Sequence, residues 1–599
     1  MQLTTLDYLI IFIFFGITLT IGIIVSKKSS KNTEEYFLSG RNMPWWLLGF
    51  SMVATTFAAD TPLFVADVVR QNGVSGNWVW WTFLLTGMLT VFIYARLWRR
   101  SNVKTDLEFY ELRYSGKVAQ FLRGFRAIYL GLIFNVLVMS AVMLAAIKIG
   151  GIMLGLEAWE IVIYAGIITV IFSAIGGFRG VVYTDFILFI VAMIGAIAAA
   201  YYAVNLPEVG GLKQLLNNEA VQSKMAFLPD FSNKELLMSL LIIPLAVQWW
   251  SAWYPGAEPG GGGYIAQRML AAKDEKNAVG ATFFFNIMHY AIRPWPWILV
   301  ALASIVVFPN LESLHQAFPN IPMDKIGHDL AYPAMLNFLP AGLIGLVISS
   351  LIAAFMSTIS THLNWGSSYI VNDFYKRFVK PEASEKEQVW VAKISTVLLM
   401  ILSSLLALSF SNALQIFDTI IAFGAGTGLI FILRWFWWRI NAWSEITAMI
   451  VSGIVSISLN KYQEILFGAD ATFPAWSKFP IIVLITTIAW VIVTLLTKPE
   501  DAETLEKFYE KIQPASYGWK PVINKARQKG KNLFNPNVDR SLSFGILAMV
   551  IGTILVYAIL FGIGNLIYAK NLYAAILFAI ALLCSVILTK MWPKIKGNL

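Results

Sequence analysis

The chain has 599 residues, of which 58% are hydrophobic and only 13% are charged. A soluble globular chain carries roughly 25% charged residues, so this composition excludes an ordinary soluble domain and indicates a protein embedded in lipid. The formal net charge of +10 does not point to nucleic acid, because the basic residues cluster between apolar runs, where they set membrane topology. Cys584 is the only cysteine, which excludes an intramolecular disulfide and a cysteine-based metal cluster.

Apolar runs that could cross a bilayer as helices recur along the chain, for example at residues 8–25 and 544–563. They are continuously apolar rather than alternating, which excludes an outer-membrane barrel. The first run is too long for a signal peptide and lacks a cleavage site, so we expect it to remain as a helix. The sequence predicts an all-α polytopic membrane protein with about fifteen transmembrane helices. Their centres lie near residues 16, 57, 87, 137, 167, 193, 246, 293, 347, 400, 424, 450, 488, 553 and 581.

Basic residues follow the odd-numbered helices. They are Lys27, Lys28, Lys31 and Arg41 after the first, Arg96, Arg99, Arg100, Lys104, Arg113, Lys117, Arg123 and Arg126 after the third, Arg268 and Lys273 after the seventh, and Lys376, Arg377 and Lys380 after the ninth. Because cytoplasmic loops are enriched in Lys and Arg, this pattern places the N-terminus outside. The C-terminus, with Lys590, Lys594 and Lys596, is then cytoplasmic. We predict a multi-pass protein of the cell's inner (plasma) membrane.

The longest predicted internal connection covers residues 498–540. Its start carries apolar residues at helical spacing among acids and lysines, which predicts an amphipathic helix at the membrane surface. We favour a simple packing role for this helix over a regulatory one. The apolar residues are Leu505, Phe508, Tyr509 and Ile512.

Two predicted spans are interrupted. The second contains an acid and a proline at residues 57–62 (FAADTP), and the seventh ends in residues 253–263 (WYPGAEPGGGG), which cannot form a regular helix. Secondary transporters place their binding sites where helices unwind at mid-membrane. The two breaks are five spans apart, as two inverted five-helix repeats would produce. The glycine run is not a phosphate-binding loop, since no Gly-Lys-Ser or Gly-Lys-Thr follows it.

Four stretches resemble the sodium:solute symporter family, whose members have the LeuT-type fold. They are residues 36–41 (YFLSGR), 176–185 (GGFRGVVYTD), 267–273 (QRMLAAK), and 353–361 (AAFMSTIST) leading to 372–375 (NDFY). The resemblance implies a core of two inverted repeats, at residues 44–235 and 236–440. Residues 1–43 would form a peripheral helix and loop, and residues 441–599 the peripheral C-terminal helices.

The resemblance also implies a first sodium site. Ala354, Ser357, Thr358 and Thr361 share one face of the ninth helix because they are spaced i, i+3, i+4 and i+7. Sodium is a hard cation that binds several oxygen ligands. Matched by position to the family pattern, its ligands are the backbone carbonyls of Ala54, Phe57 and Ala354 and the hydroxyls of Ser357 and Thr358. The alternative is that these small residues only allow helices to approach closely.

The family pattern implies a second sodium site formed by Asp185, Ser357, Ser360 and Thr361. A carboxylate with three hydroxyls is a suitable set of ligands for a hard cation, and a bound cation would stabilise an acid in an apolar helix. The alternative is that Asp185 lies solvated at the cytoplasmic mouth and helps sodium to leave.

Candidate substrate-binding residues lie at and around the breaks. Asp60 and Thr61 match two polar positions of sugar-transporting members, and an acid at mid-membrane is a functional candidate by default. Trp253 is suited either to stacking on a sugar or to anchoring at the membrane interface. His289, with Arg293, lies near the position of a lysine that binds substrate in sugar carriers.

Together these features predict a sodium-coupled symporter that takes up a small polar solute, with a sugar or related solute favoured, by alternating access. Sodium is the only cofactor that we expect, and no enzymatic activity, nucleic acid or obligatory protein partner is implied. Two alternatives stay open. One is a proton-coupled carrier of the same fold, in which Asp60 or Asp185 titrates, and the other is a membrane sensor that transports nothing.

Overall fold

The computed structural model describes residues 3–26, 32–251, 258–319, 323, 326–409, 424, 426–461 and 474–596. These residues form helices and loops, and no strand is assigned among them. Eleven of the helical segments are long and apolar enough to cross a membrane. The prediction of an all-α polytopic protein is therefore confirmed.

The N-terminal part begins with the long helix α1. The short helices α2 and η1 follow, and then the first broken helix, which consists of α3 and α4. The elements are α1 Thr5–Ser26, α2 Thr33–Leu38, η1 Ser39–Arg41, α3 Trp45–Thr55, α4 Thr61–Asn72, η2 Val74–Asn77, α5 Trp78–Trp81, α6 Leu84–Leu89, η3 Thr90–Tyr94, α7 Ala95–Ser101, α8 Glu108–Arg113, α9 Gly116–Ile128, η4 Tyr129–Phe134, α10 Asn135–Leu154 and α11 Ala158–Val204. Gly177, with a φ of 52°, divides α11, as expected for two successive spans centred near residues 167 and 193.

The middle of the chain runs from α12 to α24, and in it η6 ends at Trp250 and α16 begins at Gly263. Its elements are α12 Leu212–Asn217, α13 Glu219–Gln222, α14 Lys234–Leu237, η5 Met238–Ile242, α15 Ile243–Ala246, η6 Gln248–Trp250, α16 Gly263–Ala271, α17 Glu275–Asn286, η7 Ile287–Ile292, α18 Pro294–Val307, α19 Leu311–Ala317, η9 His328–Leu330, α20 Ala331–Leu336, α21 Leu343–Ser368, η10 Tyr369–Val379, α22 Glu385–Ser409 and α24 Gly428–Leu433.

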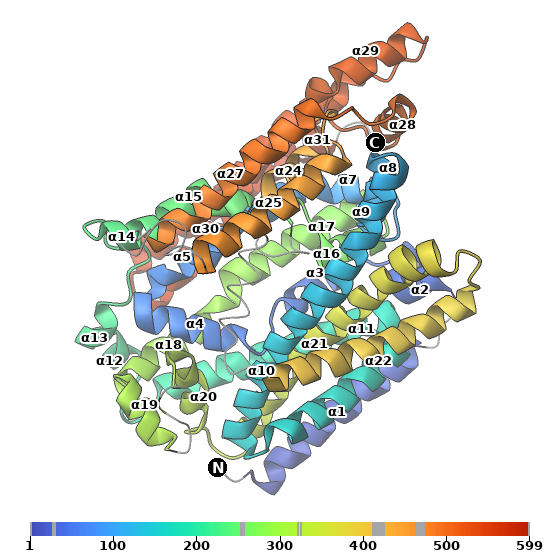
Figure 1. Cartoon of the computed structure of the whole chain (residues 1–599). Coiled ribbons are helices and arrows are strands. Elements are labelled where there is room, and N and C mark those ends of the chain that lie inside the picture. Colours follow the sequence, from blue (N-terminus) through green and yellow to red (C-terminus); the bar gives the residue numbers. More distant parts are fainter. Residues whose placement is uncertain are drawn as a thin grey trace.

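The C-terminal part consists of four long helices and a small cap. They are α25 Ala442–Lys461, α27 Ala475–Leu496, α28 Ala502–Ile512, η11 Ser516–Gly518, α29 Lys520–Gln528, α30 Pro536–Ile567 and α31 Asn571–Lys596. The N-terminus and the C-terminus lie at opposite ends of the helix bundle, and α28 and α29 lie at the end that carries the C-terminus (Figure 1).

Burial distinguishes the centre of the bundle from its lipid-facing rim. In the span Leu343–Val379, which contains α21, 83% of the most apolar window is buried, whereas only 22% is buried in each of the spans Thr5–Gly22 and Asn571–Lys594. A membrane helix that buries its whole circumference must pack against protein on every side. Helix α21 is therefore central, and it packs against α3, α10, α11, α16 and α22.

Several arginines that the sequence assigns to cytoplasmic loops are buried instead. Arg113 is 0% exposed and donates to the carbonyl oxygens of Arg434 (2.9 Å) and Trp437 (3.0 Å). Arg123 donates to Asp373 (2.7 Å), and Arg126 pairs with Glu258. Counting the basic residues in a predicted loop does not show whether an arginine is solvated or is buried against carbonyl groups and acids.

The predicted amphipathic helix is α28, and its apolar face packs on protein rather than on lipid. Phe508 stacks on Trp519 of the following turn (5.4 Å between ring centroids) and contacts Phe109 of α8 (5.7 Å). The guanidinium of Arg113 lies 5.3 Å from the Phe508 ring. On its polar face, a hydrogen bond from Lys529 lowers the pKa of Glu506. The favoured packing role is thus consistent with the structure.

Candidate functional site

The first broken helix ends against the centre of α21. Helix α3 stops at Thr55 and α4 starts at Thr61, with Pro62 in its first turn, as the sequence predicts. The Thr358 hydroxyl donates to the carbonyl oxygens of Thr55 (2.9 Å) and Ala354 (3.1 Å). The carbonyl of Ala54 accepts from the N–H of Phe57 (3.0 Å).

Of the five residues expected at the first sodium site, Thr358 contacts the break through the carbonyl of Thr55, whereas the hydroxyl of Ser357 donates to Asp185 of α11. Ala54, Phe57, Ala354, Ser357 and Thr358 are each 3% exposed or less. The break supplies carbonyl oxygens, and α21 supplies the hydroxyl of Thr358. Backbone and hydroxyl oxygens gathered at an interruption are the donor set that a hard monovalent cation uses in transporters.

A buried acid lies beside this site. Asp185 of α11 is 0% exposed and accepts hydrogen bonds from Ser51 of α3 and from Ser357 of α21 (2.7 Å). Its carboxylate also lies 3.7 Å from a guanidinium nitrogen of Arg268, whose side chain is likewise 0% exposed. The acid is thus enclosed rather than solvated, which argues against a position at an open cytoplasmic mouth.

Arg268 connects α16 to α3 and to α21. Its guanidinium donates to the hydroxyls of Thr361 (2.7 Å), Ser51 (3.1 Å) and Thr55 (3.4 Å). The sequence interpretation assigned Arg268 to a cytoplasmic loop, and that assignment is wrong, because α16 continues through the residue and turns it inward. A charge buried without a partner is unstable, so Arg268 and Asp185 depend on one another.

The residues expected at the second sodium site are only partly convergent. Asp185 pairs with Arg268, Ser357 donates to Asp185, and Thr361 accepts from Arg268. Ser360 is also buried, but its hydroxyl donates to the carbonyl of Ser357 within α21 (3.2 Å). In this conformation the cation beside Asp185 is the guanidinium of Arg268.

The expected substrate residues lie on the other side of the break. The Thr56 hydroxyl is 3.0 Å from Nδ1 of His289 and accepts from Arg293 (3.2 Å), so His289 and Arg293 both reach the interruption. Asp60 ends the break, and Thr61 begins α4, its N–H donating to the carbonyl of Ala58 (3.1 Å). Trp253 lies outside the described residues.

Two polar atoms near this part of the break have no hydrogen-bond partner among the described residues. They are Oδ1 of Asp60 and Nε of Arg293, and both are buried. The two side chains are close enough to interact electrostatically. Buried polar atoms in native proteins are normally paired, so an acceptor and a donor left open at a helix break are suited to binding a polar solute.

Sequence reasoning missed Ser51, Thr55 and Arg268 as parts of the site. Ser51 and Thr55 precede the break at i and i+4, so they lie on the face of α3 that meets α21. That spacing was available in the sequence as a signal. The inward position of Arg268 had no comparable signal beyond its place in the stretch at residues 267–273.

Comparisons with known proteins agree with this geometry. The sequence profile described as "SSF: Sodium:solute symporter family" matches residues 36–452. A sodium/glucose cotransporter of Vibrio parahaemolyticus is 25% identical over 468 residues, covering 75% of this chain and 84% of that protein. The sodium/sialic acid symporter SiaT of Proteus mirabilis is 24% identical over 492 residues, covering 78% and 91%.

A solved structure shows the same fold. It is the substrate-bound outward-open state of a Na+-coupled sialic acid symporter, which matches with a TM-score of 0.65 and 21% identity, over 84% of this chain and all of that chain. This likeness confirms the predicted LeuT-type fold. The matched profile covers more than half of the sequence, and the chain belongs to the sodium:solute symporter family, whose members are membrane transporters rather than enzymes.

Proposed function

We propose that this protein is a sodium-coupled symporter that takes up a sugar or a related polyhydroxylated solute by alternating access. The observation that carries the proposal is the contact between the α3 break and α21, where the Thr358 hydroxyl meets the carbonyl of Thr55 (2.9 Å). A cation bound there would hold the two helices together, so binding of Na+ and opening of the solute site would be coupled. The residues that we assign to it are Ala54, Phe57, Ala354, Ser357 and Thr358.

The substrate class follows from the chemistry at the break and from the relatives. The sodium/glucose cotransporter and the sodium/sialic acid symporter are named for solutes with many hydroxyl groups. Hydroxyls can donate to the open oxygen of Asp60 and accept from the open Nε of Arg293 at the same time. Thr61 and His289 would complete the polar wall.

Replacing Asp60 with Asn should raise the KM for the solute by roughly tenfold, because a charge-assisted hydrogen bond is exchanged for a neutral one. The half-saturating sodium concentration should change much less, since Asp60 is not among the assigned sodium ligands. Uptake of radiolabelled glucose and of sialic acid, measured at varied solute and varied Na+, separates the two effects. Asp67→Asn is the matched control, because Asp67 lies on α4, the helix that follows Asp60, and accepts a hydrogen bond from Gln71 (2.7 Å).

Equal changes in solute and sodium dependence would instead assign Asp60 to the ion path. A solute-binding screen by thermal shift, with sugars, sialic acids, amino acids and monocarboxylates in the presence and absence of Na+, identifies the substrate independently.

We further propose that Asp185, Ser357, Ser360 and Thr361 bind a second sodium ion in another conformation. For this, Arg268 must release Asp185, and the Ser360 hydroxyl must leave the carbonyl of Ser357. A small displacement of α16 against α21 would exchange the guanidinium for the ion, which conserves the charge beside the carboxylate. Sigmoidal sodium dependence that becomes hyperbolic in Ser360→Ala supports this exchange, whereas hyperbolic dependence in the wild type leaves Arg268 as the permanent partner.

The proposed setting is the plasma membrane, with the N-terminus outside and the C-terminus in the cytoplasm. The two termini lie at opposite ends of the bundle (Figure 1), which supports an odd number of crossings. Lys590 and Lys594, near the end of α31, are exposed at the proposed cytoplasmic side. No protein partner is needed for the proposed activity.

A further inference from the structure

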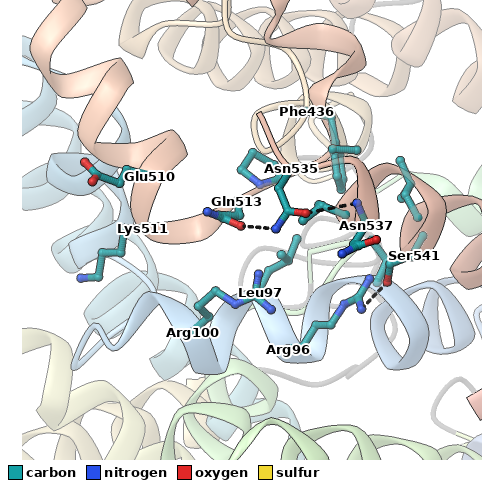
Figure 2. Close-up of a pocket in the computed structure, with 15 residues that line it drawn as sticks. Arg96, Leu97, Arg100, Phe436, Glu510, Lys511, Gln513, Asn535, Asn537 and Ser541 are labelled. Carbon is teal, nitrogen blue, oxygen red and sulfur yellow. Dashed lines mark hydrogen bonds between the residues drawn. The ribbon is translucent and has the colours of Figure 1, made fainter. Parts of the chain in front are cut away.

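A cavity of about 230 Å³ lies at the end of the bundle that carries α28, and none of its lining residues belongs to either helix break. Its walls come from α7, from the turn after α28 and from the start of α30 (Figure 2). The lining residues are Ile93, Arg96, Leu97, Arg100, Phe436, Glu510, Lys511, Gln513, Pro514, Ala515, Asn535, Asn537, Val538, Ser541 and Leu542. Neither the sodium sites nor the solute site uses any of them.

One wall of the cavity carries two separate sets of hydrogen-bonded polar groups (Figure 2). Arg96 donates to the hydroxyl of Ser541 (2.6 Å). Asn535 donates to the side-chain oxygen of Gln513 (3.2 Å) and accepts from the N–H of Asn537 (3.1 Å). The wall therefore presents a guanidinium and several amide groups, which are donors of the kind that bind phosphate oxygens.

The charge of the lining favours an anion. Arg96, Arg100 and Lys511 are basic and Glu510 is acidic, and in Figure 2 the charged ends of Glu510 and Lys511 both point away from the polar wall. Arg100 pairs with Glu275 (3.0 Å), Arg96 places a guanidinium in the wall, and Lys511 adds an exposed ammonium at the rim. Cations around a partly enclosed space attract anions more strongly than the same charges on an open surface.

The position of the cavity relates it to the bilayer. It lies where two candidate membrane spans, Val74–Ser101 and Pro536–Ile567, reach the end of the bundle. Leu542 lines the cavity, and the next residues on the same face of α30 at intervals of four, Ile546 and Val550, are 50% and 49% exposed. An apolar stripe thus leads from the polar wall along the lipid-facing side of the helix.

We propose that this cavity binds the phosphate headgroup of an anionic phospholipid, with one acyl chain along Leu542, Ile546 and Val550. Basic pockets between membrane helices are suited to such headgroups. A free phosphate would use the same polar wall, but it would gain nothing from the apolar stripe. A bound lipid would join α7 to the turn after α28 and to α30, and so would fasten the cap formed by α28 and α29 to the membrane domain.

The test uses the purified full-length protein in detergent, with phosphatidylglycerol, phosphatidylcholine or inorganic phosphate added. Thermal unfolding and native mass spectrometry report stabilisation and retained lipid. Phosphatidylglycerol should stabilise the wild type more than phosphatidylcholine does, and inorganic phosphate should have little effect. Lys511→Gln and Arg96→Gln should each weaken lipid binding roughly tenfold, by loss of one charge-assisted contact.

Lys507→Gln is the matched control, because Lys507 lies on the same helix α28 but pairs with Glu503 (2.6 Å) outside the cavity. It should bind phosphatidylglycerol like the wild type. Lys511 is exposed, so its substitution keeps the fold even if Arg96→Gln does not. Equal retention of phosphatidylglycerol by Lys511→Gln and Lys507→Gln would overturn the proposal. Equal stabilisation by inorganic phosphate and by the lipid would overturn it too, by showing that the site takes a soluble anion.

Discussion

Replacing Arg268 with Met is expected to lower the stability of the folded protein by roughly 3–5 kcal/mol, because it leaves the carboxylate of Asp185 buried without its cation. Both side chains are 0% exposed, and the remaining partners of Asp185 are the neutral hydroxyls of Ser51 and Ser357. Two hydroxyls cannot replace a positive charge in a medium of low polarity. The loss should appear as a lower midpoint of thermal unfolding in detergent, together with loss of uptake.

The double variant Arg268→Met with Asp185→Asn gives the control. Since the double variant removes both charges, it should lower the stability of the folded protein by clearly less than the sum of the losses in the two single variants. Sodium provides a further comparison, because an ion that can occupy the place of the guanidinium should stabilise Arg268→Met more than it stabilises the wild type. An Arg268→Met protein with an unchanged unfolding midpoint would contradict the proposed dependence of Arg268 and Asp185 on each other.

Removing either hydroxyl of the first sodium site should raise the half-saturating sodium concentration by roughly tenfold or more. The reason is that an ion with few ligands depends on every one of them. The variants are Ser357→Ala and Thr358→Val, which keep the helix contact while removing the oxygen. Sodium dependence of uptake at saturating solute is the measurement. The effect of Thr358→Val should fall on sodium alone, because Thr358 touches only the break and its own helix.

The matched control for these variants is Ser349→Ala. Ser349 lies on the same helix α21 and is 1% exposed, but its hydroxyl donates to the carbonyl of Gly345 (2.8 Å), away from the break. It should leave sodium dependence unchanged. If Ser349→Ala and Thr358→Val weakened sodium dependence equally, the hydroxyls of α21 would serve helix packing in general, and the assignment of the sodium site would fail.

The interrupted helices could be predicted from local chemistry. A proline such as Pro62 kinks or breaks a helix when it lies in the interior, and an acid such as Asp60 is unstable in an uninterrupted apolar span. The structure ends α3 at Thr55 and starts α4 at Thr61, so the observed break overlaps the predicted segment 57–62 but begins and ends slightly earlier. The face of α21 that carries Ser357 and Thr358 was likewise fixed by the helical period alone.

The residues that a side chain contacts were harder to predict than the face of the helix on which it lies. Nothing near Arg268 in the sequence shows that α16 turns it toward Asp185, because that contact depends on how helices distant in sequence pack together. For the same reason Arg113 was assigned to a solvated loop although its guanidinium caps backbone carbonyls. Phe508 was correctly placed on an apolar face, but the period does not say whether lipid or Trp519 covers that face.

The measurement that tests the central proposal most directly is solute uptake into proteoliposomes at a fixed pH on both sides. An inward Na+ gradient should drive accumulation of a sugar or sialic acid above its external concentration, and replacing Na+ with choline should abolish it. Thr358→Val should reduce this accumulation at low Na+ and recover it at high Na+. Accumulation that follows an imposed proton gradient without Na+, or binding of solute with no uptake under any gradient, would contradict sodium-coupled transport and favour the proton-coupled carrier or the sensor.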